Sequence, residues 1–198
     1  MQTTCRLSLL LAAAATLVTS VAAQAQNAPA PTTPTGHKNG LEVDALWPIF
    51  PGSLRVHVTR QLWQRGHLRG DAYVGANVDF PQNRDTEGRF ADYSVASGYR
   101  QYFWRGLHAE FSQTLGMGVL DNHVTTGKDY RSFDWLITGY AGYRFNLGRS
   151  RYYLIPQVGV ANVAYKSNPW PIFEDKTLTR EVGEQPFVLG ALRFGFSF

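Results

Sequence analysis

The sequence predicts an all-β fold, a closed antiparallel eight-stranded transmembrane β-barrel, and three observations lead to that prediction. Apolar and polar residues alternate with a period of two from Leu41 onward. Charged residues make up only 17% of the 198 residues, while glycine and aromatic residues are plentiful, which favours strands. The mean hydropathy of -0.24 is too polar for a bundle of membrane helices, but it suits a barrel in which alternate residues face lipid.

The first 25 residues have the three-part pattern of a cleaved secretory signal peptide. A basic residue, Arg6, precedes a short apolar run at 7–18, and small residues in an A-x-A pattern follow and end at Ala25. The run is too short to cross a bilayer, which takes ~20 apolar residues. Residues 26–40 are rich in proline and threonine and predict a flexible lead-in. The single cysteine, Cys5, lies in the signal segment, so the mature chain would have no disulfide.

Residues 41–198 are predicted to form the barrel, because eight successive segments show the strand pattern. An even number of strands suits an antiparallel sheet that closes in a bilayer, where an unpaired sheet edge could not be satisfied. The segments are 41–49, 54–62, 71–80, 92–103, 107–119, 133–145, 152–161 and 188–198.

The links between these segments alternate in length, which predicts short periplasmic turns and longer outer loops. The link at 51–53 is the exception, since it is short where an outer loop is expected. Short links are predicted at 64–70, 105–106 and 146–151, and longer ones at 81–88, 121–132 and 166–185.

The last segment has the clearest alternation, and Phe194, Phe196 and Phe198 fall on its apolar face. This ending looks like the C-terminal signal by which the barrel assembly machinery recognises its clients. Residues 41–198 resemble the small eight-stranded outer-membrane barrels of the OmpA, OmpX and OmpW-like superfamily, notably in GYRQYFWRGLHAEFSQTLGMG and YYLIPQVGVANVAY. The resemblance implies a monomer in the cell outer membrane, with the lipid bilayer, lipopolysaccharide and the barrel assembly machinery as partners.

Inward-facing polar residues should meet in a buried network, because eight strands enclose a space that side chains just fill and a buried charge needs a partner. Arg100 and Glu110 are the favoured ion pair, since one short hairpin separates them. We expect the network to act as a plug, and a path for protons or solutes is the alternative. The predicted members are Glu42, Asp44, Arg100, Tyr102, Glu110, Tyr140, Arg144, Gln157 and Arg193.

The sequence predicts no catalytic residue, no metal site and no cofactor. His108, Glu110 and Ser112 share one strand face and resemble an esterase triad, but residues two apart on a strand are separated by ~7 Å, beyond hydrogen-bond reach. A nucleophile for lipid A would have to face lipid, and the His-x-Ser arrangement of lipid A deacylases is absent. The histidines show no spacing typical of metal ligands. They are His37, His57, His67, His108 and His123.

Two further features concern the surface. The longest predicted loop contains Trp170, Ile172 and Phe173, which would either contact a partner outside the cell or cap the mouth of the barrel. The aromatic clusters 102–104 and 152–153 are interpreted as interfacial girdle residues. The formal charge of +4 comes from dispersed lysines and arginines, so we predict tolerance of anionic lipid and no nucleic-acid binding.

These observations leave three classes of function open. The leading one is a structural or interaction protein that anchors in the membrane and presents loops outside. The second is a narrow channel, or an OmpW-like transporter of small or hydrophobic solutes, which a wet lumen with measurable conductance would favour. The third and weakest is a lipid A-modifying enzyme, for which His108 or Ser112 would have to be essential.

Overall fold

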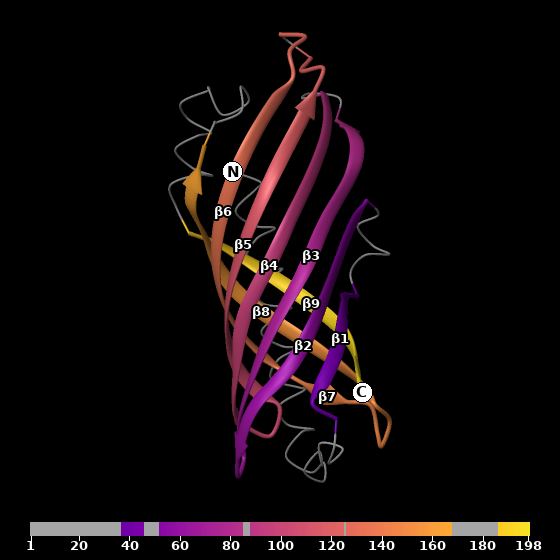
Figure 1. Cartoon of the computed structure of the whole chain (residues 1–198), viewed down its shortest axis with the longest axis vertical. Coiled ribbons are helices and arrows are strands. Elements are labelled where there is room, and N and C mark those ends of the chain that lie inside the picture. Colours follow the sequence, from indigo (N-terminus) through magenta and orange to yellow (C-terminus); the bar gives the residue numbers. More distant parts are fainter. Residues whose placement is uncertain (1–36, 46–51, 85–87, 125, 168–185) are drawn as a thin grey trace, which may run out of the picture. The chain divides into compact units, whose positions relative to one another are not determined.

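The computed structural model describes residues 37–45, 52–84, 88–124, 126–167 and 186–198 (Figure 1). The expected signal peptide and most of the lead-in lie outside the described residues. So do the predicted contact residues Trp170, Ile172 and Phe173.

The described residues form one antiparallel sheet of nine strands that returns on itself as a ring. The hydrogen-bonded order is β6-β5-β4-β3-β2-β1-β9-β8-β7, and an additional pairing of β6 with β8 joins the two ends. None of the described residues belongs to an apolar helix of membrane-spanning length. The strands are β1 (Asn39–Asp44), β2 (Ser53–Arg65), β3 (Leu68–Arg84), β4 (Gly88–Trp104), β5 (Leu107–Asp121), β6 (Tyr130–Tyr143), β7 (Phe145–Asn146), β8 (Tyr152–Lys166) and β9 (Phe187–Ser197).

The ninth strand arises because the segment predicted at 133–145 is interrupted at Arg144. The pairing with β8 stops at Gly142 opposite Gln157 and resumes in the same register at Phe145 opposite Leu154. Pro156 lies in the gap and has no N–H to donate, so the ladder lapses there. The Arg144 amide instead donates to the carbonyl of Gly106, in the neighbouring turn. β6 and β7 therefore both pair with β8, one after the other along its length.

The prediction of a loop at 81–88 was wrong, because strand structure continues through most of that segment. β3 runs to Arg84 and β4 begins at Gly88. Pro81 has no N–H to donate to the ladder. The register instead shifts between Asp79 and Gln82, and this irregularity accommodates the proline within paired strands.

Short links join β2 to β3, β4 to β5 and β7 to β8 at one end of the ring, which we call the turn end; it is the lower end in Figure 1. The opposite end, where β5 and β6 connect, is the loop end. Glycine suits these turns, since Gly66 and Gly148 have φ of 59° and 64°. Arg105 also adopts a left-handed φ of 51°, immediately before Gly106.

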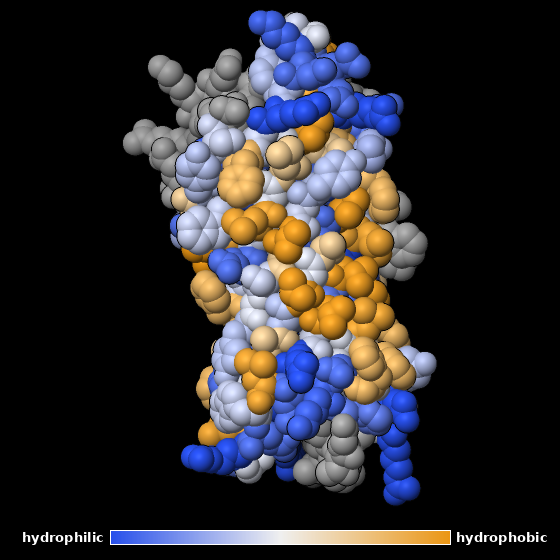
Figure 2. Space-filling model, in the orientation of Figure 1, coloured by the Kyte–Doolittle hydropathy of each residue, from blue (hydrophilic) through white to orange (hydrophobic). Residues whose placement is uncertain are grey.

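The polarity of the two faces of the sheet is the reverse of that in a soluble protein. Outward residues are apolar and exposed, with 55% of Val74 and 55% of Val158 accessible. Inward residues include charged side chains that are almost fully buried, such as Glu42 at 0% and Arg100 at 1%. Figure 2 shows apolar residues gathered across the middle of one face, with hydrophilic residues toward both ends. The alternation in the sequence thus places apolar side chains outside and polar ones inside.

Candidate functional site

Four charged side chains meet inside the ring, and we call them the ionic cluster: Glu42, Arg100, Glu110 and Arg193. They come from β1, β4, β5 and β9, and each occupies an inward position of its strand. Arg100 and Glu110 are direct partners in the β4–β5 register. Their exposed fractions are 0% for Glu42, 1% for Arg100, 4% for Glu110 and 6% for Arg193. Strand pairing therefore fixes the positions of all four side chains.

Arg100 lies at the centre of the ionic cluster and bridges its two carboxylates. Its Nε donates to Oε2 of Glu110 at 2.7 Å. Its Nη1 and Nη2 donate to Oε1 and Oε2 of Glu42 at 2.8 and 3.0 Å, which is a bidentate pair. Nη1 also reaches the hydroxyl of Tyr102 at 3.3 Å. The guanidinium thus uses both edges on charged acceptors, as a buried cation must.

Arg193 and two tyrosines complete the hydrogen bonding of the carboxylates. Nη2 of Arg193 donates to Oε1 of Glu110 at 2.8 Å, while Nη1 lies 3.5 Å from Oε2 of Glu42. The hydroxyl of Tyr73 donates to Glu110 at 2.8 Å, and that of Tyr153 donates to Glu42 at 3.0 Å. Two carboxylates and two guanidiniums carry no net charge together. Each of the four charged groups therefore has at least one oppositely charged partner inside the ring.

The structure brings together Arg100 and Glu110, the pair favoured from the sequence, and adds Glu42 and Arg193 to it. Tyr140 lies beside the ionic cluster, with its ring centroid 5.9 Å from the Arg193 guanidinium. These residues of the predicted network therefore form one group across the ring.

Three predicted members lie apart from that group. Asp44 follows Glu42 on β1 toward the loop end, and its carboxylate lies 3.8 Å from the Arg55 guanidinium. Arg144 stacks on the ring of Tyr153 at 3.6 Å, and its Nη2 donates to Ser197 at 2.9 Å, at the turn end. Gln157 is buried, and its side-chain amide has no hydrogen-bond partner among the described residues.

Tyr73, Tyr153 and the buried pair Arg69–Asp71 were missing from the predicted network. The Arg69–Asp71 ion pair measures 2.7 Å, and Arg69 also stacks on Tyr102 at 4.1 Å. Placing Tyr102 and Tyr153 in the interfacial girdle was wrong, since both are buried inside the ring at 2% and 0% exposure. Strand parity carried the signal, because each follows or precedes an outward aromatic residue and so points inward.

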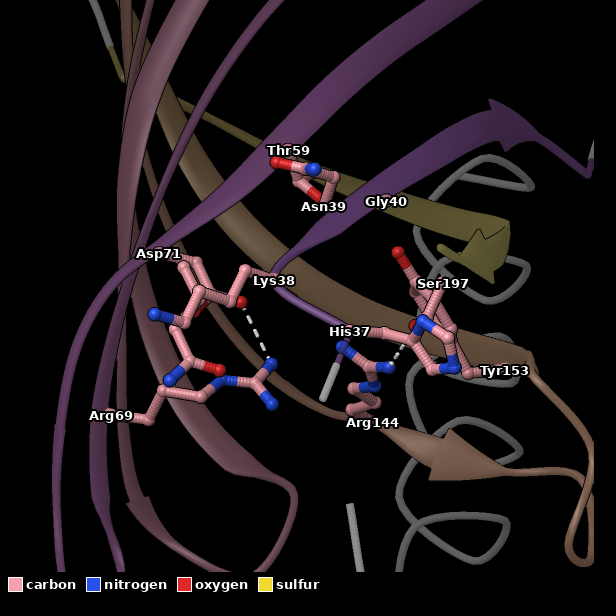
Figure 3. Close-up of a pocket in the computed structure, with 11 residues that line it drawn as sticks. His37, Lys38, Asn39, Gly40, Thr59, Arg69, Asp71, Arg144, Tyr153 and Ser197 are labelled. Atoms are coloured by element: carbon pink, nitrogen blue, oxygen red, sulfur yellow. Dashed lines mark hydrogen bonds and ion pairs between the residues drawn. The ribbon is translucent and has the colours of Figure 1, made fainter. Parts of the chain in front are cut away.

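Cavities lie on both sides of the ionic cluster. On the turn-end side a cavity of about 10 Å³, room for about one water, contacts Lys38, Arg69, Asp71, Arg144 and other residues labelled in Figure 3. On the loop-end side lies a cavity of about 180 Å³, with a largely apolar surface that also carries acidic and basic side chains. It is lined by Asp92, Ser94, Thr114, Gly116, Asp134, Leu136, Val163 and Lys166. The two cavities share no lining residue, and none of the four ionic-cluster residues lines either of them.

The three residues that resemble a triad all point inward. His108 is 2% exposed, and its Nδ1 lies 3.1 Å from the carbonyl oxygen of Gly106. Glu110 is engaged in the ionic cluster, and Ser112 is buried at 6% exposure. Within the described ranges, no group of three histidine, cysteine or acidic side chains is placed to hold a metal ion.

Comparison with known proteins found no matching family model, curated protein or solved structure. The resemblance to the small outer-membrane barrels therefore stays a prediction from the sequence.

Proposed function

We propose that this chain is a closed, eight-stranded transmembrane β-barrel of an outer membrane, with a structural or interaction role. In this account β6 and β7 are one wall strand broken at Arg144, so the ring has eight positions. The apolar outer rows anchor the barrel in lipid, the ionic cluster locks the interior, and the loop end faces outward.

The main support for the proposal is that the ring is apolar on its outer face and charged in its interior. Large apolar side chains such as Val95, Phe111 and Val158 are 56%, 53% and 55% exposed, while the largest fully buried side chain in the described ranges is that of Arg100. In water such an outer face would leave a wide apolar surface uncovered, which monomeric soluble proteins rarely do. Hydrocarbon would cover it, and a ring without free edges suits a solvent that cannot hydrogen-bond to the backbone.

The spacing of aromatic residues on the outer face also supports a membrane location. On β4, Tyr93 and Phe103 are 49% and 46% exposed, with Val95 between them. Ten residues of strand extend about 33 Å, and a tilt of about 40° reduces this to about 25 Å across the membrane. That is about the height of the apolar band between the aromatic girdles of outer-membrane barrels.

The interior favours the structural role over the two other classes. A channel or a transporter would need a continuous path, whereas the two cavities share no lining residue and the four side chains of the ionic cluster are almost fully buried. A lipid A-modifying enzyme would need its nucleophile at the lipid, whereas His108 and Ser112 are buried on the inner face.

The mature protein should resist SDS at room temperature and migrate faster than the boiled protein, because an intact ring binds less detergent than an unfolded chain. Gel electrophoresis with and without heating measures this. The same unheated preparation should give no conductance steps in planar bilayers. Identical migration with and without heating would count against the barrel, and regular conductance steps would count against the sealed interior.

Deleting Phe198 should strongly reduce the amount of folded protein in the outer membrane. The residue supplies the last apolar side chain of the predicted assembly signal, and its backbone exchanges two hydrogen bonds with Asn39 at 3.2 and 3.0 Å. Phe198→Ala keeps these backbone bonds and separates the two effects. We expect this variant to fold in detergent as the wild type does but to assemble poorly in cells. Normal assembly of both variants would show that the terminus is not a recognition signal.

A further inference from the structure

The charges of the chain are distributed unequally along the ring. Among the described residues between the ionic cluster and the turn end, eight lysines and arginines accompany one acidic side chain, that of Asp71, so these side chains carry a formal charge of +7. Asp71 is itself buried and paired with Arg69. The eight cations are Lys38, Arg60, Arg65, Arg69, Arg105, Arg144, Arg149 and Arg151.

Five of these cations are exposed and form no ion pair within the described part of the chain: Lys38, Arg60, Arg65, Arg149 and Arg151. Outside the described ranges, residues 1–36 and 46–51 contain no aspartate or glutamate, and the six remaining acidic residues lie at 85–87 and 168–185, in the sequence between strands that join at the loop end. A concentration of one sign of charge without compensation raises the local potential and attracts anions.

The loop end is different, because acidic and basic side chains alternate there. Arg89 is opposite Asp121 in the register, and Lys166 lies 3.9 Å from Asp134. Six described aspartates lie on this side of the ionic cluster: Asp44, Asp79, Asp92, Asp121, Asp129 and Asp134. The dispersed positive charge predicted from the sequence is therefore concentrated at the turn end.

Two of the cations at the turn end lie beside apolar or aromatic side chains of the outer wall. Arg60 points outward between Val58 and Leu62, which are 49% and 58% exposed. Arg105 stacks on the ring of Trp104 at 4.5 Å, and Trp104 is 51% exposed. Long basic side chains at such positions keep their stems on apolar surface and extend their heads toward the membrane interface.

We propose that the turn end binds the headgroups of anionic phospholipids in the leaflet that surrounds it, an inference that rests on the proposed membrane barrel. Arginine matches phosphate well, since its planar guanidinium donates two parallel hydrogen bonds. A lipid is favoured over a soluble anionic polymer because Arg60 lies in the outer wall, within the apolar rows, and Arg105 is held against an interfacial tryptophan.

The test uses the mature protein reconstituted in vesicles of phosphatidylcholine and phosphatidylglycerol, mixed at roughly four to one to keep the anionic lipid in the minority. After mild solubilisation, native mass spectrometry counts the lipids that stay bound. We expect several-fold enrichment of phosphatidylglycerol over the vesicle composition, and we expect salt to reduce it. The variant Arg60→Gln/Arg65→Gln/Arg149→Gln/Arg151→Gln should retain lipids in the proportion of the vesicle.

The matched control removes four basic residues from the loop end, as Arg89→Gln/Lys128→Gln/Arg131→Gln/Lys166→Gln, and should keep the enrichment. Equal loss in both variants, or no enrichment in the wild type, would overturn the inference. Co-sedimentation with purified peptidoglycan sacculi tests the alternative that the turn end binds a polymer instead of lipid. Sacculus binding that is lost in the turn-end variant while lipid retention stays unchanged would also overturn it.

Heat-dependent migration, recorded for every variant, separates this inference from the proposed function. A chain that shifts on heating but shows no lipid preference contradicts only the lipid site. A chain that shows no shift contradicts the barrel itself.

Discussion

Replacing Arg100 by methionine should lower the free energy of unfolding by about 3–5 kcal/mol, the usual result of breaking a buried ion pair from one side. Arg100 is 1% exposed and donates to both Glu42 and Glu110. Its removal leaves two buried carboxylates with Arg193 as the remaining cation of the ionic cluster. Arg100→Lys keeps the charge but loses the fork that reaches both partners, so we expect an intermediate loss.

Urea unfolding of the protein folded in phospholipid vesicles measures this effect. Arg55→Met is the matched control, because the Arg55–Asp44 pair is 3.8 Å long and the Arg55 side chain is 47% exposed. Exposed pairs contribute about 0–1 kcal/mol, so the control should unfold almost as the wild type does. Equal stability of the Arg100 and Arg55 variants would show that the ionic cluster does not lock the interior.

Replacing Val158 by arginine should destabilise the vesicle-bound protein by about 2–4 kcal/mol, the cost of a basic residue near the bilayer midplane of a barrel. Val158 is 55% exposed and lies near the middle of β8, between the outward aromatic residues Tyr152 and Tyr165. In a water-soluble protein, the same change at such an exposed position would usually alter stability by less than about 0.5 kcal/mol.

The control for this prediction is Val124→Arg, in the link between β5 and β6. Val124 is 60% exposed, so the two residues are similar in accessibility, but Val158 lies in the wall of the ring and Val124 in a link at the loop end. Equilibrium unfolding in vesicles should give a large loss for Val158→Arg and almost none for Val124→Arg. Losses of equal size would mean that the β8 surface does not contact hydrocarbon.

Strand parity predicted much of the site from the sequence, because residue alternation alone fixes which side chains share the interior. Arg100 and Glu110 could be paired in advance, since a two-residue turn sets their register. Glu42 and Arg193 had the correct inward parity, but they come from β1 and β9. Their contact with the pair depends on closure of the ring, which no local pattern determines.

Two features of the strands were not predicted from the sequence. Arg144 has the inward parity of Tyr140, but it lies past Gly142 toward the turn end, where its side chain binds Ser197 instead of joining the ionic cluster. The segment predicted as a loop at 81–88 contains Pro81, and a register shift keeps this residue inside paired strands. Both features depend on how a strand pairs with its neighbours, which the residues of that strand alone do not determine.

Spin labels on the outer face can show whether hydrocarbon or water surrounds it. In the mature chain, the single variants Val158→Cys and Val124→Cys are spin-labelled, folded into vesicles and exposed to oxygen and to a water-soluble relaxing agent. Because oxygen concentrates in hydrocarbon, we expect it to relax the label at 158, which should be shielded from the water-soluble agent, and we expect the reverse at 124. If the water-soluble agent relaxes the label at 158 as strongly as the label at 124, the outer face does not lie in a membrane.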